Sequence, residues 1–201
     1  MTRWIGLAAA CAATLAAAPA AAQYMQQEPQ APGFAAANLR LPPRDAQGAY
    51  VTPNRDLTGH AAFWNLRIAL NVAAIGCRHP GSLQLVADYN NIIARHGGLI
   101  RSAEGAVIAR IGVPARDKMS TKLFNYFAQP PAQKQFCPAA GSIAAQVSGM
   151  SADDVVARAP ALLAELDRPF IDFYHAYARY QDDLAAWRSG RGGVQVASIQ
   201  R

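Results

Sequence analysis

Two residues near the end of the chain have the types and spacing of a metal-binding or acid–base pair. Asp172 and His175 stand three positions apart in a segment of helical periodicity, which places both side chains on one face of a helix. A carboxylate and an imidazole in this arrangement could hold a metal ion, alone or with His79 or His96. A di-metal centre would need a second acid-x-x-His pair, which the sequence lacks, and two more glutamates, of which the mature chain has only Glu28, Glu104 and Glu165 to offer. We therefore predict a local hydrogen-bonded pair, with a metal site at Asp172 and His175 as the alternative.

Amide, phenol and guanidinium groups interrupt segments that are otherwise apolar. A buried amide must form hydrogen bonds, because leaving it unpaired costs on the order of 1–3 kcal/mol. Such groups, among them Asn65, either fix the register of packed helices or line a groove for a small or anionic ligand. The candidates for such a ligand site are Asn90, Arg95, Asn125, Tyr126 and Arg179.

The motifs of common catalytic and cofactor sites do not occur in the sequence. It contains no G-x-S-x-G, no H-E-x-x-H, no C-x-x-C or C-x-x-C-H, and no glycine-rich phosphate loop. We therefore predict no cofactor and no catalytic residue, and the sequence favours a binding or scaffolding protein over an enzyme.

The first 22 residues have the pattern of a cleaved bacterial secretory signal peptide. Arg3 precedes an uncharged apolar run over residues 4–18, and residues 20–22 form an A-x-A exit before a polar sequence. We predict cleavage after Ala22 and export to the periplasm or secretion. The alternatives are an uncleaved anchor or a lipid attached at Cys11.

Cleavage would leave two cysteines, Cys77 and Cys137. In an oxidising compartment such a pair is expected to form a disulfide. A disulfide between them would close a loop of 60 residues and stabilise the fold by roughly 4 kcal/mol on the chain-entropy model. Two buried free thiols are the alternative.

The formal net charge is +6, and a basic exported protein could associate with an anionic cell-envelope component. The basic residues form no consecutive block and do not alternate with aromatic residues, so the pattern does not favour nucleic acid as a partner. The best apolar run after the signal peptide, residues 61–77, is interrupted by polar residues and is shorter than the ~20 residues that span a bilayer. We predict no transmembrane segment in the mature chain.

The mature chain divides into a leader, one domain and a tail. Residues 23–56 are rich in Gln, Pro, Ala and Gly, which predicts a flexible leader that is held to the domain at Tyr50 and Val51. Residues 57–188 repeat apolar side chains at helical spacing and predict a single helical domain. Residues 189–201 predict a disordered tail.

The helical domain is predicted to be an all-α, irregular bundle of five to six helices with one disulfide. The first helix is apolar over most of its circumference and should be central. In the last helix, Ser151 and Asp154 form a capping box, and Pro160 and Pro169 should kink or split it. The expected helices cover residues 60–76, 82–96, 102–111, 117–128 and 138–148, followed by a long one after Ser151.

These patterns predict an exported helical binding or scaffolding module with a small or anionic ligand between its helices. A periplasmic enzyme or metal-binding bundle that uses Asp172 and His175 is the competing hypothesis.

Overall fold

The computed structural model describes residues 27–190, and most of this part is α-helical. No β-strand occurs within these residues, which contain one isolated bridge between Arg44 and Tyr50. The predicted all-α class is therefore confirmed. The predicted signal peptide and nearly all of the predicted tail lie outside the described residues. The helices are α1 (Gly59–Gly76), α2 (Ser82–Ile111), α3 (Val113–Phe127), α4 (Gln133–Gly149) and α5 (Ala152–Arg188), with short 3-10 turns η1 (Pro32–Phe34) and η2 (Pro130–Ala132).

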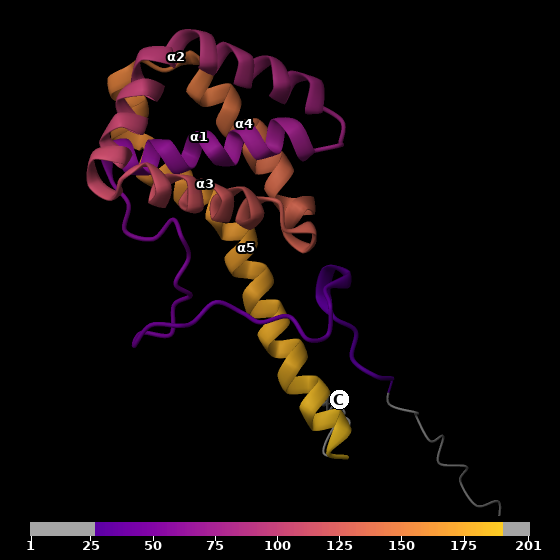
Figure 1. Cartoon of the computed structure of the whole chain (residues 1–201). Helices are drawn as coiled ribbons and strands as arrows, with labels where there is room; N and C mark the ends of the chain where they lie inside the picture. The colour runs from indigo at the N-terminus through magenta and orange to yellow at the C-terminus, as the bar shows by residue number, and fades with distance from the viewer. Residues whose placement is uncertain (1–26, 191–201) are drawn as a thin grey trace, which may run out of the picture.

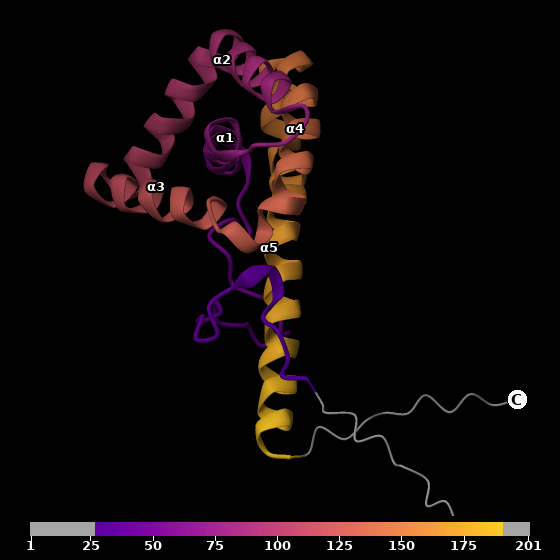
Figure 2. The ribbon, with the colours of Figure 1, turned by 90° about the vertical axis from the view of Figure 1, so that its right-hand side faces the viewer.

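Helix α1 lies at the centre of the bundle and contacts the other four α-helices. Viewed nearly end-on, it is surrounded by α2, α3 and the adjacent pair α4 and α5 (Figure 2). Large side chains such as Phe63 and Leu66 are buried on it together with Ala69 and Ala73. The alanines allow neighbouring helices to approach closely while the larger groups fill the space between them. The predicted central position of this helix follows from this all-round apolar composition.

Helix α2 is one element, whereas the sequence predicted two helices that end and restart around Gly97 and Gly98. The backbone departs from helical geometry at His96 (φ −106°, ψ 19°), and the helix then continues to Ile111. His96 is buried, and its Nε2 lies 3.3 Å from the carbonyl oxygen of Val147 on α4. Tertiary packing on both sides of the bend thus outweighs the low helix propensity of the two glycines.

Helix α5 is also continuous, and Pro160 and Pro169 do not split it. Pro169 is buried, so its packing offsets the hydrogen bond that its missing N–H removes. The predicted cap is present, since the Ser151 hydroxyl oxygen accepts a 3.2 Å hydrogen bond from the backbone N–H of Asp154. In both ribbon views α5 extends well beyond the other helices (Figures 1 and 2).

The segment before α1 lies along the extending half of α5 (Figure 1). The Tyr177 hydroxyl donates to the carbonyl of Ala36 at 2.6 Å and accepts from the backbone N–H of Leu39 at 3.0 Å. Tyr50 is buried, as expected of the attachment point, and its hydroxyl donates to the carbonyl of Tyr174, whereas Val51 is exposed. Residues 27–56 belong to the predicted flexible leader, residues 23–56, and these hydrogen bonds attach part of it to α5. The flexibility of the leader stays a prediction. The segment has few large apolar groups, but the Tyr177 hydroxyl of α5 provides partners for its backbone.

A covalent link joins the end of α1 to α4. The Sγ atoms of Cys77 and Cys137 are bonded at 2.00 Å, with their Cα atoms 5.7 Å apart, as the predicted pairing requires. No helix of residues 27–190 is both long and apolar enough to cross a membrane. The disulfide is compatible with a location outside the cytoplasm.

Candidate functional site

A buried carboxylate on α5 accepts hydrogen bonds from three other side chains. Asp167 is 5% exposed. Its Oδ2 accepts a 2.6 Å hydrogen bond from the Thr52 hydroxyl, and its Oδ1 accepts from the Asn54 amide at 2.5 Å. The Tyr126 hydroxyl on α3 donates to the same Oδ1 at 2.6 Å. These groups, with Asn65, are called the Asp167 cluster below.

Asn65 on α1 extends this network by one step. Its Nδ2 donates to Oδ1 of Asn54 at 3.0 Å and to the carbonyl of Pro53 at 3.2 Å. Residues from the N-terminal segment, α1, α3 and α5 therefore meet around one carboxylate. Because an unpaired buried amide is costly, this arrangement fixes the position of the N-terminal segment relative to three helices.

The surroundings of Tyr126 keep its phenol protonated beside the carboxylate of Asp167. Burial raises the pKa of Tyr126 far above its ordinary value, and the negative charge of Asp167 raises it further. Tyr126 therefore keeps its proton and donates a hydrogen bond to the carboxylate. The three direct hydrogen-bond partners of Asp167 are all electrically neutral.

A cavity of about 410 Å³ opens beside the cluster, between residues 49–57 and α5. Asp167, Thr52 and Asn54 form its polar wall. Leu57, Pro160 and Ile171 contribute apolar surface. This space is called the Asp167 cavity.

Arg55 on the wall of this cavity and Arg44 beside Tyr50 both have other partners. Arg55 lies on its wall and pairs with Asp45 at 2.5 Å and with Asp56 at 3.2 Å. The guanidinium of Arg44 lies 4.5 Å from the centre of the Tyr50 ring and donates to the Tyr50 hydroxyl. Arg55 thus has oppositely charged partners, whereas the direct hydrogen-bond partners of the Asp167 carboxylate are all uncharged.

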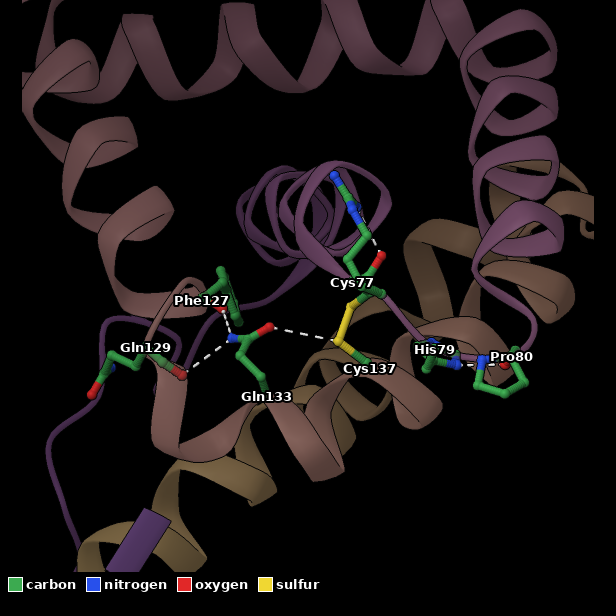
Figure 3. The surroundings of a disulfide bond; sticks show 8 residues. Cys77, His79, Pro80, Phe127, Gln129, Gln133 and Cys137 are labelled. Carbon is green, nitrogen blue, oxygen red and sulfur yellow. Dashed lines mark hydrogen bonds between the residues drawn. A yellow bond between two sulfur atoms is a disulfide. The ribbon is translucent and has the colours of Figure 1, made fainter. Parts of the chain in front are cut away.

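A second cavity, of about 610 Å³, borders the disulfide. Figure 3 shows the disulfide and the side chains around it. Cys77, Cys137 and His79 line it together with the cationic side chains Arg78 and Lys134. A ring nitrogen of His79 lies within 4.8 Å of both sulfur atoms. The Nε2 atom of His79 is buried and has no hydrogen-bond partner, whereas Nδ1 lies 2.6 Å from the carbonyl oxygen of Pro80. This space is called the disulfide cavity.

Of the five predicted ligand-site residues, Tyr126 lies in the Asp167 cluster, whereas Asn90, Arg95 and Asn125 are exposed on α2 and α3. The prediction treated the helical line that contains Asn90 as buried. That line faces solvent instead, and its apolar members are exposed by 86%, 37% and 43% for Leu83, Val86 and Ile93. Helical spacing gives the faces of a helix, but it does not say which of two apolar faces packs inward.

The remaining candidates lie on α5. Asp172, His175 and Arg179 are exposed. Asp172 and Arg179 line a third cavity, of about 400 Å³, together with Lys134. The ring of His175 packs edge-on against Tyr50, with 5.1 Å between the ring centres. A metal at Asp172 and His175 stays a prediction. Among residues 27–190, the three side chains whose ligand atoms lie close enough together to share a metal ion are those of Cys77, His79 and Cys137.

Sequence reasoning missed Asp167 and its partners Thr52 and Asn54. Asp167 stands between the buried residues Leu163 and Phe170 at helical spacing, and an acid on an apolar helix face is the signal that could have revealed it. Thr52 and Asn54 carry no such signal, because they belong to the proline-rich segment that predicted a flexible leader.

Comparisons of the chain with family models, curated proteins and solved structures give no match. The function is therefore argued from the geometry of the sites.

Proposed function

We propose that this protein is an exported helical binding module that takes a small cationic ligand, such as an alkylamine, in the Asp167 cavity. The signal-peptide pattern of residues 1–22 supports export. The bonded cysteine pair supports an oxidising location. The absence of a recognisable catalytic motif supports binding rather than catalysis.

The observation that carries this proposal is a buried carboxylate with neutral partners on the wall of a cavity. A buried charge costs several kcal/mol unless it is paired or well hydrogen-bonded. An ionised carboxylate offers about four lone-pair positions. Thr52, Asn54 and Tyr126 occupy three of them. The ammonium group of a ligand would use the remaining position on Oδ2 and supply the opposite charge.

The dimensions and walls of the cavity suit a small molecule. Its volume of about 410 Å³ falls within the range of roughly 300–1,000 Å³ that is typical of ligand pockets. The apolar side chains of Leu57, Pro160 and Ile171 would contact the hydrocarbon part of the ligand. A cationic ligand differs from the anionic one that the sequence suggested, because Arg95 lies on the exposed surface and Arg179 lines a different cavity.

Isothermal titration calorimetry with a matched panel tests the proposal. The panel contains butylamine, 1,4-diaminobutane, butyrate and phosphate. We expect saturable binding of an amine and none of the anions. Asp167→Asn should weaken amine binding by at least about 30-fold, because removing one partner of a buried charge pair costs 2 kcal/mol or more.

Asp172→Asn is the matched control, since it removes an exposed carboxylate from the same helix. This variant should bind the amine as the unmodified protein does. Circular dichroism establishes that both variants keep their helix content. Unchanged affinity in folded Asp167→Asn, or binding of the anions and of no amine, would overturn the proposal.

A further inference from the structure

We propose that reduction of the disulfide turns Cys77, Cys137 and His79 into a binding site for a thiolate-seeking divalent metal ion, of which Zn²⁺ is the representative. The inference concerns the disulfide cavity and is independent of the Asp167 cavity. In the oxidised protein the two sulfurs are bonded to each other. The metal site therefore exists in the reduced protein alone.

The three ligand atoms already lie close together. The two sulfurs and a ring nitrogen of His79 are all within 4.8 Å of one another. Zn²⁺ binds thiolate sulfur at about 2.3 Å and imidazole nitrogen at about 2.0–2.1 Å. In a tetrahedral site such ligands lie roughly 3.5–4 Å apart. Rotation of the cysteine side chains after reduction is enough to reach this spacing, with the backbones of α1 and α4 held by their packing.

The hydrogen bonding of His79 suits a metal ligand. Its Nδ1 faces the Pro80 carbonyl oxygen at 2.6 Å, and a carbonyl can only accept, so Nδ1 carries a proton. The lone pair of the neutral ring is then on Nε2, which is buried and has no hydrogen-bond partner. A ring N–H bonded to a backbone carbonyl is the usual way in which a ligating histidine is oriented. The buried Nε2 is thus a free acceptor on a ring that has one nitrogen within 4.8 Å of both sulfurs.

The surroundings supply charge and an open coordination position. Arg78 and Lys134 line the same cavity, and positive charge stabilises the thiolates that reduction makes available. A divalent ion and two thiolates are together neutral, so these cations do not oppose the loaded site. Three protein ligands leave a fourth position for water or another molecule. The adjoining cavity of about 610 Å³ has room for it.

The chemistry is a two-electron reduction followed by metal binding. A dithiol reductant transfers two electrons and two protons to the S–S bond, which gives the thiols of Cys77 and Cys137, and it becomes a cyclic disulfide. Zn²⁺ then displaces the proton of each thiol, and Nε2 of His79 donates its lone pair without losing a proton. In the reverse reaction the cyclic disulfide takes up two electrons and two protons and becomes the dithiol again, while the two cysteine thiolates re-form the S–S bond and release the ion.

Cobalt titration of the full chain carrying Cys11→Ser tests the site, because Cys77 and Cys137 are then its sole cysteines. The protein is reduced with a water-soluble phosphine, which takes up oxygen from water, and the phosphine is removed without air. We expect one Co²⁺ per chain, with a sulfur-to-cobalt charge-transfer band and tetrahedral d–d bands that Zn²⁺ abolishes. The oxidised protein should show none of these bands.

His79→Ala should weaken cobalt binding by about 100-fold or more, since loss of an outer-shell partner alone costs 10–100-fold. His60→Ala is the matched control, because His60 is exposed near the opposite end of α1. Octahedral cobalt spectra without a thiolate band, or equal affinities of the two variants, would overturn the proposal. Circular dichroism follows folding. If the reduced protein loses helix, Co²⁺ must restore it, and failure to do so also refutes the site.

Discussion

The hydroxyl of Tyr126 on α3 lies 2.6 Å from Oδ1 of Asp167 on α5, and both residues are buried. This bond joins two helices that are far apart in sequence through a phenol and a carboxylate. Thr52 and Asn54 bind the same carboxylate. Asp167 is therefore one of the points at which the N-terminal segment is fixed to the helical bundle.

Tyr126→Phe is expected to lower the free energy of unfolding by about 1–3 kcal/mol at pH 7. The substitution removes one of the two donors to Oδ1 of Asp167 and leaves the Asn54 amide as the other. Hydrogen bonds to charged groups contribute in this range. Urea unfolding followed by circular dichroism measures the loss. A loss below about 0.5 kcal/mol would mean that water replaces the phenol as a donor.

The same substitution should change the response of the protein to alkaline pH. Because the folded-state pKa of Tyr126 is raised above the unfolded value of 10.0, its contribution to stability is present below pH 10 and is lost as the pH rises beyond it. The free energy of unfolding should therefore fall less steeply above pH 10 in Tyr126→Phe than in the unmodified protein. Parallel curves for the two proteins from pH 8 to 11 would contradict this assignment.

Tyr177→Phe is expected to loosen the N-terminal segment while the helical bundle stays folded. The lost hydroxyl bridges the Ala36 carbonyl and the Leu39 N–H, so both backbone groups lose a partner. Hydrogen exchange at the Leu39 amide should accelerate by about 10-fold, which corresponds to the ~1.4 kcal/mol of a typical hydrogen bond. Tyr180→Phe removes a hydroxyl from the next buried position of the same helix face and should leave this amide unchanged. Equal exchange in the two variants would show that other contacts hold the segment.

The periodicity of the sequence predicts the helices well where one face is strongly apolar. The first helix was expected over residues 60–76 and is found at Gly59–Gly76, and Ser151 caps the last helix as expected. The exceptions lie at Gly97 and at Pro169, where local propensity opposes a helix. There the buried contacts of His96 and Phe170 maintain it, and these long-range contacts are not visible in a single sequence.

The polar interior was harder to predict than the helices. Tyr126 was recognised as a polar group on an apolar helix, but Asp167 was not, and Asn54 belongs to a segment whose composition predicts flexibility. A hydrogen bond between residues 113 positions apart, such as that of Asn54 with Asp167, depends on the tertiary arrangement. Local spacing carries no information about it.

Two glycines near α2 should respond to alanine with opposite signs. Gly98→Ala is expected to stabilise the protein by about 0.5–1 kcal/mol, because Gly98 lies inside the helix and an added Cβ meets nothing within 4 Å. Gly81→Ala is expected to destabilise it, since Gly81 has a φ of +94°, which strains any L side chain. Thermal unfolding of both variants checks the pair. Destabilisation by Gly98→Ala would indicate that α2 needs a flexible residue after its bend at His96.

Removing the disulfide should be the most destabilising of these changes. The bond closes a loop over a sequence separation of 60 residues, which contains all of α2 and α3. The double variant Cys77→Ala, Cys137→Ala frees the unfolded chain from this constraint and should lower the free energy of unfolding by about 2–5 kcal/mol. Urea unfolding measures the difference, and chemical reduction of the unmodified protein in the absence of metal should give a similar loss. A loss below about 1 kcal/mol in both cases would mean that the unfolded chain keeps α1 and α4 close together without the bond.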